Sequence, residues 1–451
     1  MKRTIILLFS SILLASAQEN KTLTLESAVD LALQKNVNVI QAQNSLEASQ
    51  SATRAAHGNL LPSLDAGASF SRNQSWRNTL GGTTVVDGIP FTYPASNSFS
   101  ASSSFGASIS SRVTLFNGFA NTSNISRANS NETATGYDLT RTRQSVIYQT
   151  HQLYLNVVRT YQLLKVSEEN LKRSKRQLER ITESNKVGAV ALADVYRQQV
   201  QSGSDELGLI QAQNNFEKAK ADLVAFLGVE FEGNYAVDLT GVPEKIDTAE
   251  FAPLNARFSN YDALVKTGVE SRPDYLASME NVNSADATVT IARAGHLPTV
   301  GASGSFGYSA NEFSLSRLTD NRGLNVSLSV SLPIFSGFST QNQIEQAQVS
   351  RKNADENLKQ ARRQIAVDIR KALLDLESSE KQVMVTQASV QSAEMDRKIA
   401  EEKYNLGAGT LLDLLIANAN YTNALSNKVN AVIGYLLSKK QTEFALGTIT
   451  Q

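Results

Sequence analysis

The chain has 451 residues, no cysteine and a formal net charge of zero at pH 7. A chain without a basic excess is a poor partner for nucleic acid, and without cysteine it must be held together by packing and assembly, not by disulfides. Its three histidines are scattered, and neither a catalytic-triad order nor a glycine-rich phosphate loop occurs. The sequence therefore predicts no catalytic, cofactor-binding or metal site, and no enzyme.

The first residues have the pattern of an export signal. Lys2 and Arg3 precede a ten-residue run at 5–14 that is apolar except for Ser10 and Ser11, and the small residues 15–17 follow it. This is the layout of a signal peptide, whereas a helix that spans a bilayer needs ~20 apolar residues. We therefore expect residues 1–17 to be removed on export. No later stretch is long and apolar enough to span as a helix, so entry into a membrane would require β-strands.

An internal repeat organises the rest of the chain. The sequence LPS at 61–63 recurs as LPT at 297–299, an offset of 236 residues, and FNGF at 116–119 recurs as FSGF at 335–338, an offset of 219. The second offset then stays constant along both copies. We expect a signal peptide at 1–17, repeat 1 at 18–229, an equatorial linker at 230–259 and repeat 2 at 260–451.

Each repeat is expected to contain a helix, two strands, a very long helix and a further helix. The first helix is expected over residues 23–59, because glycine and proline are absent until residue 58. Residues 76–94 are expected to form an external loop in repeat 1, and residues 311–322 a shorter one in repeat 2.

Four segments alternate apolar and polar residues with the period of a β-strand. The clearest runs from Leu324 to Leu332, where Leu and Val alternate with Asn and Ser. Runs of ~9–11 such residues suit a transmembrane barrel. Because four strands cannot enclose a pore, the chain must oligomerise, and a trimer would supply twelve strands. The other three segments run through 64–70, 105–115 and 300–308.

The segments 120–186 and 339–405 lack proline and predict two helices of 67 residues, each roughly 100 Å long. Apolar residues recur in them at every seventh position, which is typical of coiled-coil packing. Leu178 continues the first series, and Arg397 interrupts the second. The two series are Val157, Leu164 and Leu171, and Leu376, Val383 and Val390.

Together these features resemble the TolC-like outer-membrane factor family. The resemblance covers the mature chain, and its most specific motif is YNLGAGTLLDLL at 404–415. It implies a fold that is mainly α with a membrane β-barrel: a homotrimer with a twelve-stranded barrel in the outer membrane and a coiled-coil helical tunnel across the periplasm. The implied partners are a periplasmic adaptor protein, an inner-membrane transporter and outer-membrane lipid.

The resemblance implies a channel that passes solutes out of the cell, with efflux of small molecules favoured. A type I protein-secretion duct shares the architecture, and the sequence does not separate the two. A structural coiled-coil protein of the envelope would explain export and the heptads, but it would not explain four amphipathic strands.

The turns after the long helices contain the candidate site residues. Gly188 and Gly407 follow the helix ends, where glycine adopts a left-handed conformation without strain. The resemblance implies that these tips, with Gly409, dock the adaptor. Asp194 and Asp413 lie six residues beyond the two glycines.

Asp194 and Asp413 have two interpretations. Each could stabilise the positive end of its own helix, or threefold symmetry could make each a ring of carboxylates that selects cations at the periplasmic aperture. The family's aperture tyrosine corresponds to Tyr404. A second family aspartate is Ile416 in this chain, and a tip arginine is replaced by Gly409. These departures predict an aperture that is less firmly closed and less cation-selective.

Overall fold

A computed structural model describes residues 22–229, 236–239, 241–243, 245–258, 260–311 and 321–450. The expected signal peptide lies outside these ranges, as do most of the expected loop at 311–322 and part of the linker at 230–259. Within the described ranges, no helix combines the length and hydropathy needed to cross a membrane.

The chain forms two compact units that cut across the expected repeats. One unit contains the described part of Met1–Leu46 with Thr135–Ser278 and Leu358–Gln451, and is mainly helical. The other contains Glu47–Ala134 and Met279–Asn357 and holds the main sheet. Each unit therefore combines segments of both repeats.

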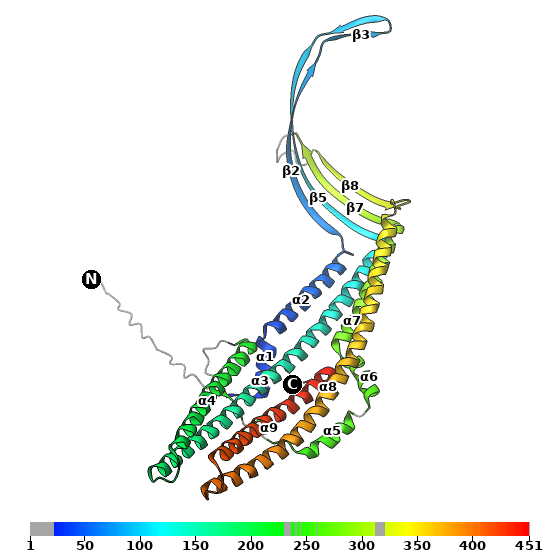
Figure 1. Cartoon of the computed structure of the whole chain (residues 1–451). Helices are drawn as coiled ribbons and strands as arrows, with labels where there is room; N and C mark the ends of the chain where they lie inside the picture. The colour runs from blue at the N-terminus through cyan, green and yellow to red at the C-terminus, as the bar shows by residue number, and fades with distance from the viewer. Residues whose placement is uncertain are drawn as a thin grey trace, which may run out of the picture. The chain divides into compact units, whose positions relative to one another are not determined.

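The main sheet has four antiparallel strands in the order β2-β5-β7-β8 (Figure 1). These are β2 (Ser63–Thr79), β5 (Ser96–Asn117), β7 (Thr299–Ala310) and β8 (Arg322–Ser331). The expected alternating segment forms strand β8, all of which is exposed, and its apolar residues Leu324, Val326, Leu328 and Val330 are 74 %, 77 %, 68 % and 68 % exposed. A bulge interrupts the pairing of β5 with β7 between Thr114 and Phe116.

The expected external loop at 76–94 is wrong in its greater part. Strand β2 continues to Thr79, which pairs with Ser96 of β5, and β3 (Gly82–Val86) and β4 (Ile89–Tyr93) form a further hairpin. The turn of that hairpin contains Asp87 and Gly88, both with positive φ. Such a turn favours a tight hairpin, so a strand–turn–strand arm replaces most of the loop.

The two long helices begin and end where the sequence predicts. They are α3 (Ala120–Lys186) and α8 (Ser339–Asn405), and α4 (Leu192–Leu227) and α9 (Leu411–Leu446) return from them. The heptad positions Val157, Leu164, Leu171, Leu376 and Val383 are buried, and Val390 is half-buried.

The expected helix over 23–59 is in fact two helices, α1 (Leu25–Lys35) and α2 (Val37–Gly58), separated by Asn36. The Asn36 side chain accepts a hydrogen bond from the backbone N–H of Asn38 at 2.9 Å and donates one to the Phe226 carbonyl at 2.7 Å. Asn36 is buried. The amide thereby replaces the helical bonds lost at the break. We call this arrangement the Asn36 joint.

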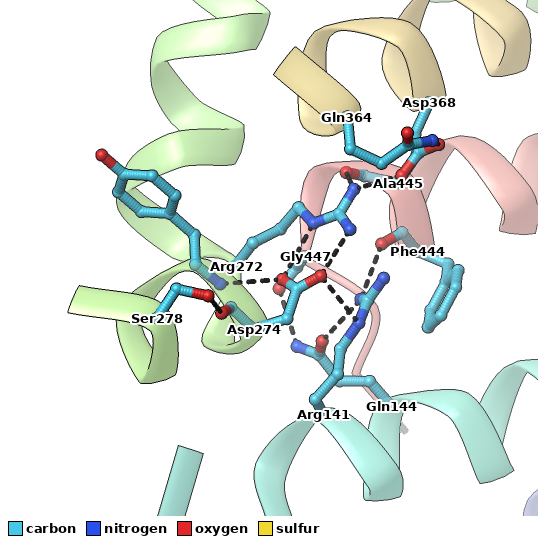
Figure 2. A network of polar contacts seen from close by, with 11 residues as sticks. Arg141, Gln144, Arg272, Asp274, Ser278, Gln364, Asp368, Phe444, Ala445 and Gly447 are labelled. Atoms are coloured by element: carbon cyan, nitrogen blue, oxygen red, sulfur yellow. Dashed lines mark hydrogen bonds and ion pairs between the residues drawn. The ribbon is translucent and has the colours of Figure 1, made fainter. Parts of the chain in front are cut away.

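A second break lies 236 residues later, at Arg272, between α6 (Tyr261–Ser271) and α7 (Pro273–Arg293). Proline favours the first position of a helix and keeps the preceding residue extended, which explains why α7 begins at Pro273. The Arg272 side chain, 5 % exposed, donates to both carboxylate oxygens of Asp274, at 3.0 and 2.6 Å. It also donates to Asp368 of α8 at 2.9 Å and to the Ala445 carbonyl of α9 at 3.4 Å (Figure 2).

Arg141 and Gln144 of α3 also belong to this group of contacts around Arg272, which we call the Arg272 joint. Arg141 stacks on the Phe444 ring at 3.9 Å and donates to the Phe444 carbonyl at 3.2 Å. Gln144 donates to the Gly447 carbonyl at 2.8 Å. The last turn of α9 has no basic residue of its own, so side chains from other helices satisfy its terminal carbonyls.

Short elements complete the helical unit. Strand β1 (Thr22–Leu23) pairs in parallel with β6 (Ala236–Val237) from the linker region. The helix α5 (Phe251–Arg257) follows the 3₁₀ turn η1 (Thr248–Glu250). In the other unit, η2 (Ala294–His296) leads into β7.

Candidate functional site

The candidate site is the pair of turns at the ends of the long helices. Gly188 and Gly407 have φ values of 78° and 72°, as expected for glycine beyond a helix end. In the second turn, Ala408 N–H donates to the Lys403 carbonyl at 2.8 Å and Gly407 N–H to the Tyr404 carbonyl at 3.1 Å. The first turn repeats this pair of bonds, so both helices end in a Schellman motif.

Asp413 lies in the first turn of α9 and forms a capping box with Thr410. Its carboxylate accepts from the Thr410 N–H at 3.1 Å and from the Thr410 hydroxyl at 2.7 Å, and its N–H donates to that hydroxyl at 3.2 Å. These hydrogen bonds lower the pKa of Asp413 below its usual value. The side chain is therefore an exposed carboxylate with a fixed position at the start of the helix.

Asp194 lies in the first turn of α4, but its surroundings differ. The residue before α4 is Ala191, which provides no side-chain cap. Instead, Asp194 forms an ion pair with Arg197 at 2.8 Å, one turn along the helix. The negative charge at the first tip is thus partly offset by a neighbouring guanidinium, whereas the Asp413 carboxylate is held by hydrogen bonds from Thr410, with a smaller electrostatic effect of Lys403.

A groove of about 810 Å³ lies between the two tips. Its lining includes Asp194 from the first tip and Tyr404, Gly407 and Gly409 from the second. Burial, and then the charge of Asp194, raise the pKa of Tyr404. A Cβ on Gly409 would lie 3.1 Å from the Lys403 Cβ, so the turn leaves little room for a side chain there. Gly188 and Asp413 do not line the groove.

Arg180 was not predicted, although it links the two long helices at this level. Its guanidinium donates to the Asn405 carboxamide of α8 at 2.7 Å and also lines the groove. Arg180 lies about two turns before the end of α3, and Asn405 is the last residue of α8. Their pairing depends on the packing of segments 225 residues apart.

A polar seam joins α3 to α9 above the tips. Arg173 donates to the hydroxyl of Thr422 at 3.2 Å, and Thr422 donates to the Asn170 carboxamide oxygen at 2.9 Å. The guanidinium carbons of Arg173 and Arg397 lie over the Tyr421 ring, at 5.5 and 5.3 Å from its centroid. This cation–π contact explains how α8 accommodates Arg397 where the heptad pattern is interrupted.

Comparison with known proteins shows the family to which a chain with these features belongs. A model of the family described as outer membrane efflux protein matches residues 28–229 and 264–448. Outer membrane protein TolC of Escherichia coli K12 is 28 % identical over 320 residues, 68 % of this chain and 62 % of TolC. TolC of Salmonella enteritidis is 26 % identical over 373 residues, 75 % of this chain and 73 % of that protein. The chain thus matches less than two thirds of the E. coli relative's length.

Solved structures share the fold. The CmeC outer membrane channel of Campylobacter jejuni superposes with a TM-score of 0.75 at 22 % identity, covering 94 % of this chain and 85 % of CmeC. The outer membrane protein VceC of Vibrio cholerae gives a TM-score of 0.72 at 21 % identity, over 94 % and 96 % of the two chains. The chain, with its long antiparallel helices and amphipathic sheet, belongs to the outer membrane efflux protein family of TolC-like channels, which are outer-membrane proteins and not enzymes.

Proposed function

We propose that the chain forms a homotrimeric duct, with a twelve-stranded barrel in the outer membrane and a helical tunnel across the periplasm. The observation that carries this proposal is the sheet. One face of β8 has four apolar residues that are each at least 68 % exposed, and the other has only asparagine and serine from Asn325 to Ser331. An apolar face that nothing covers suits lipid, and a small polar face suits a water-filled lumen. Four strands are too few to enclose that lumen, so several copies must share one wall.

The duct would pass solutes delivered by an inner-membrane transporter, because the chain has no motif for an energy source of its own. A periplasmic adaptor would dock at the helix tips, where the groove between the two turns offers backbone and polar groups from both hairpins. The efflux family supports small-molecule efflux as the duty. A type I secretion duct would use the same wall and tips.

Asp413 is the stronger candidate for a selective ring at the aperture. A ring of three carboxylates attracts cations most when no counter-ion lies beside it, and Asp413 meets that condition better than Asp194, which pairs with Arg197. The hydrogen bonds from Thr410 keep the pKa of Asp413 low, so the ring would be ionised at neutral pH.

Single-channel conductance of the purified protein in a planar bilayer tests this function. We expect discrete steps with a preference for cations, and we expect Asp413→Asn to reduce that preference several-fold while Asp194→Asn changes it less. Asparagine retains an oxygen that can accept from Thr410, so the helix start is preserved. Equal cation preference in all three proteins would assign Asp413 to helix capping alone. A protein that does not insert at all would favour the envelope coiled-coil alternative.

The resting conductance tests the departures at the aperture. Ile416 and Gly409 remove two charged groups that the family pattern contains, so we expect frequent spontaneous openings without any partner protein. Restoring one of these charges with Ile416→Asp should make these openings rarer, and it leaves unchanged the turn at Gly409, where a Cβ would lie 3.1 Å from the Lys403 Cβ. A separate experiment distinguishes efflux from secretion. In cells that lack their own duct and express this protein, restored tolerance to toxic solutes would indicate efflux, and restored export of a polypeptide would indicate secretion.

A further inference from the structure

A groove of about 710 Å³ runs between the middle of α3 and the second half of α9, away from the tips. This volume is typical of pockets that hold small organic molecules. Three apolar side chains line the groove where it meets the helical core: Leu153 of α3, and Ile433 and Leu437 of α9. We call it the α3–α9 groove, and it offers both the room and the apolar surface that a small ligand needs.

The α3–α9 groove faces away from the linker at 230–259. Tyr154 of α3 donates a hydrogen bond to the Asp238 carbonyl, and the Tyr435 ring of α9 packs edge-on against Phe251 at 5.1 Å. The residues two positions after each tyrosine line the groove, and two positions turn about 200° around a helix. The groove and the linker therefore lie on opposite faces of this helix pair. In the proposed duct the linker is a belt around the tunnel, so the groove belongs to the inner wall.

A glycine opens the groove on the α9 side. Gly434 is the one glycine between Leu411 and Leu446, and it lines the groove. Nothing in the described chain lies within 4 Å of the position that its Cβ would take, so no neighbour requires a glycine there. Glycine inside a helix is destabilising relative to alanine. Packing thus gives no reason for this glycine, whereas an open groove does.

One end of the groove carries a positive charge. Among the residues that line it in the described chain, Arg159 alone is charged, and it is exposed. The guanidinium donates to the Asn156 carboxamide oxygen at 2.6 Å, which holds it in place and leaves N–H groups for a ligand. Gln149 and Asn430 add neutral polar groups to the lining. This end therefore suits an anionic group, since charge-assisted hydrogen bonds to a guanidinium are among the strongest.

The other end of the groove is aromatic, and it lies about 16 Å away along α3. The rings of Tyr148 and Phe444 stack there, with their centroids 5.1 Å apart. Burial raises the pKa of Tyr148, and so does the charge of Asp375 on α8, so a carboxylate already acts on this end. The guanidinium of Arg141, beside Phe444, pairs with Asp274 at 3.8 Å (Figure 2). The two ends thus differ in charge, and an anion is favoured at the first.

Resting on the proposed duct, we infer that the α3–α9 groove binds small amphiphilic anions, such as aromatic sulfonates or carboxylates, in the inner wall of the tunnel. The acidic group would accept hydrogen bonds from Arg159, and the ring would lie beside Gly434 on the apolar lining. Longer molecules would extend toward Tyr148. A homotrimer would carry three such grooves at one level, so its wall would retain this class of solute during passage.

Calorimetry with 2-naphthalenesulfonate tests the binding, using the purified protein in lipid nanodiscs and empty nanodiscs as the blank. We expect one saturable site per chain, with the neutral 2-naphthalenemethanol bound about fivefold more weakly, as for the loss of one exposed charge contact. Arg159→Gln should remove most of this difference. Arg143→Gln changes an exposed arginine on another face of α3, and as the matched control it should preserve the difference. Equal binding of the two probes by the unchanged protein would overturn the anion preference.

Gly434→Leu tests the place of the site, because the new side chain fills the groove from α9. The open space at this position lets the helix accept it, and we expect sulfonate binding to weaken roughly tenfold, since the leucine occupies the space of the ring. Gly136→Leu is the matched control: nothing in the described chain lies within 4 Å of its Cβ position either, but it does not line the groove. Unchanged binding by a folded Gly434→Leu protein would overturn the site, and Arg159→Gln decides the matter if that protein unfolds.

Single-channel recording tests whether the groove lies in the tunnel. The sulfonate should cause brief blockages of the current in the unchanged protein and in Gly136→Leu, and far fewer in Gly434→Leu. A protein that conducts but has no saturable sulfonate site would overturn the groove and leave the proposed duct intact. Saturable binding without blockages would overturn the inner-wall placement. A protein that binds the sulfonate but forms no channel would overturn the duct and, with it, that placement.

Discussion

The Asn36 joint and the Arg272 joint occupy equivalent positions 236 residues apart, and they solve one structural problem with different chemistry. In both, the break residue donates from its side chain to a carbonyl near the end of the returning helix: Asn36 to Phe226 of α4, and Arg272 to Ala445 of α9. The two joints therefore share the same arrangement of break residue and acceptor carbonyl. The Asn36 joint is neutral, whereas the Arg272 joint contains two arginines and two aspartates.

The difference shows which part of the joint each repeat can change. The carbonyl near the end of the returning helix lies beside the break between the two helices. Because a buried carbonyl needs a hydrogen-bond donor, the residue at the break must supply one. The donor itself is free to be an amide or a guanidinium. The Arg272 side chain contacts three helices, α7, α8 and α9. Charged hydrogen bonds therefore connect these helices in repeat 2, whereas a single neutral amide makes the equivalent contact in repeat 1.

The largest expected effect comes from removing the charged donor. Arg272→Met would leave Asp274 and Asp368 without their shared guanidinium and the Ala445 carbonyl without this donor. We expect a loss of about 3–5 kcal/mol in the free energy of unfolding, as for other broken buried ion pairs. Asn36→Ala should cost only about 1–2 kcal/mol, because it removes neutral hydrogen bonds. Guanidinium unfolding in detergent, followed by circular dichroism, measures both.

A swap makes this comparison sharper. Arg272→Asn with Asp274→Asn places the residues of repeat 1, Asn36 and Asn38, at the equivalent positions of repeat 2. The double variant should lose less than the sum of its two single variants, because each single change leaves a charge unpaired. Additive losses would show that the charges act independently and that the joint is not a network.

The elements whose determinants are local could be predicted from the sequence. The long helices α3 and α8 were predicted with starts at residues 120 and 339 and ends near residues 186 and 405, because proline is absent and a glycine with positive φ follows each end. The exposed alternation in β8 was also readable, since it depends on a period of two residues.

The features that depend on a distant partner could not be predicted from the sequence. The break at Asn36 depends on a carbonyl 190 residues away, and nothing in the segment 23–59 marks it. Arg180 likewise pairs with a residue on another helix. The capping box of Asp413 is a different case, because Thr410 three residues before it is a recognisable helix start. The strand–turn–strand arm at 82–93 was missed because its Asp-Gly turn was assigned to a loop.

Intermediate effects are expected at the glycines that end the returning helices. A Cβ on Gly228 would lie 2.5 Å from the Lys35 carbonyl oxygen, and one on Gly447 would lie 2.9–3.2 Å from atoms of Arg272. Both glycines also have positive φ. Alanine at either position should therefore cost about 3 kcal/mol, combining crowding with left-handed strain. Similar losses at both would show that the two joints share their backbone geometry despite their different charges.

Gly188→Ala is the matched control for this pair. Gly188 has a φ of 78°, but nothing lies within 4 Å of its Cβ position in the described chain. Alanine there should cost only about 1 kcal/mol, from left-handed strain alone. A loss at Gly228 no greater than that at Gly188 would contradict close packing at the Asn36 joint.

The smallest effect is expected at the tips, where the two repeats also differ in chemistry. The offset of 219 aligns Ala191 with Thr410 and Asp194 with Asp413, so repeat 1 has the aspartate of the capping box without its threonine. Ala191→Thr should complete the box and stabilise the chain by about 0.5–1 kcal/mol. The converse change, Thr410→Ala, should destabilise it by a similar amount. Because the new hydroxyl would compete with Arg197 for Asp194, the ion pair should weaken, and the cation preference at the first tip should rise slightly. Thermal unfolding and bilayer conductance of the two variants measure these changes, and a destabilising Ala191→Thr would mean that the first tip cannot adopt the geometry of the second.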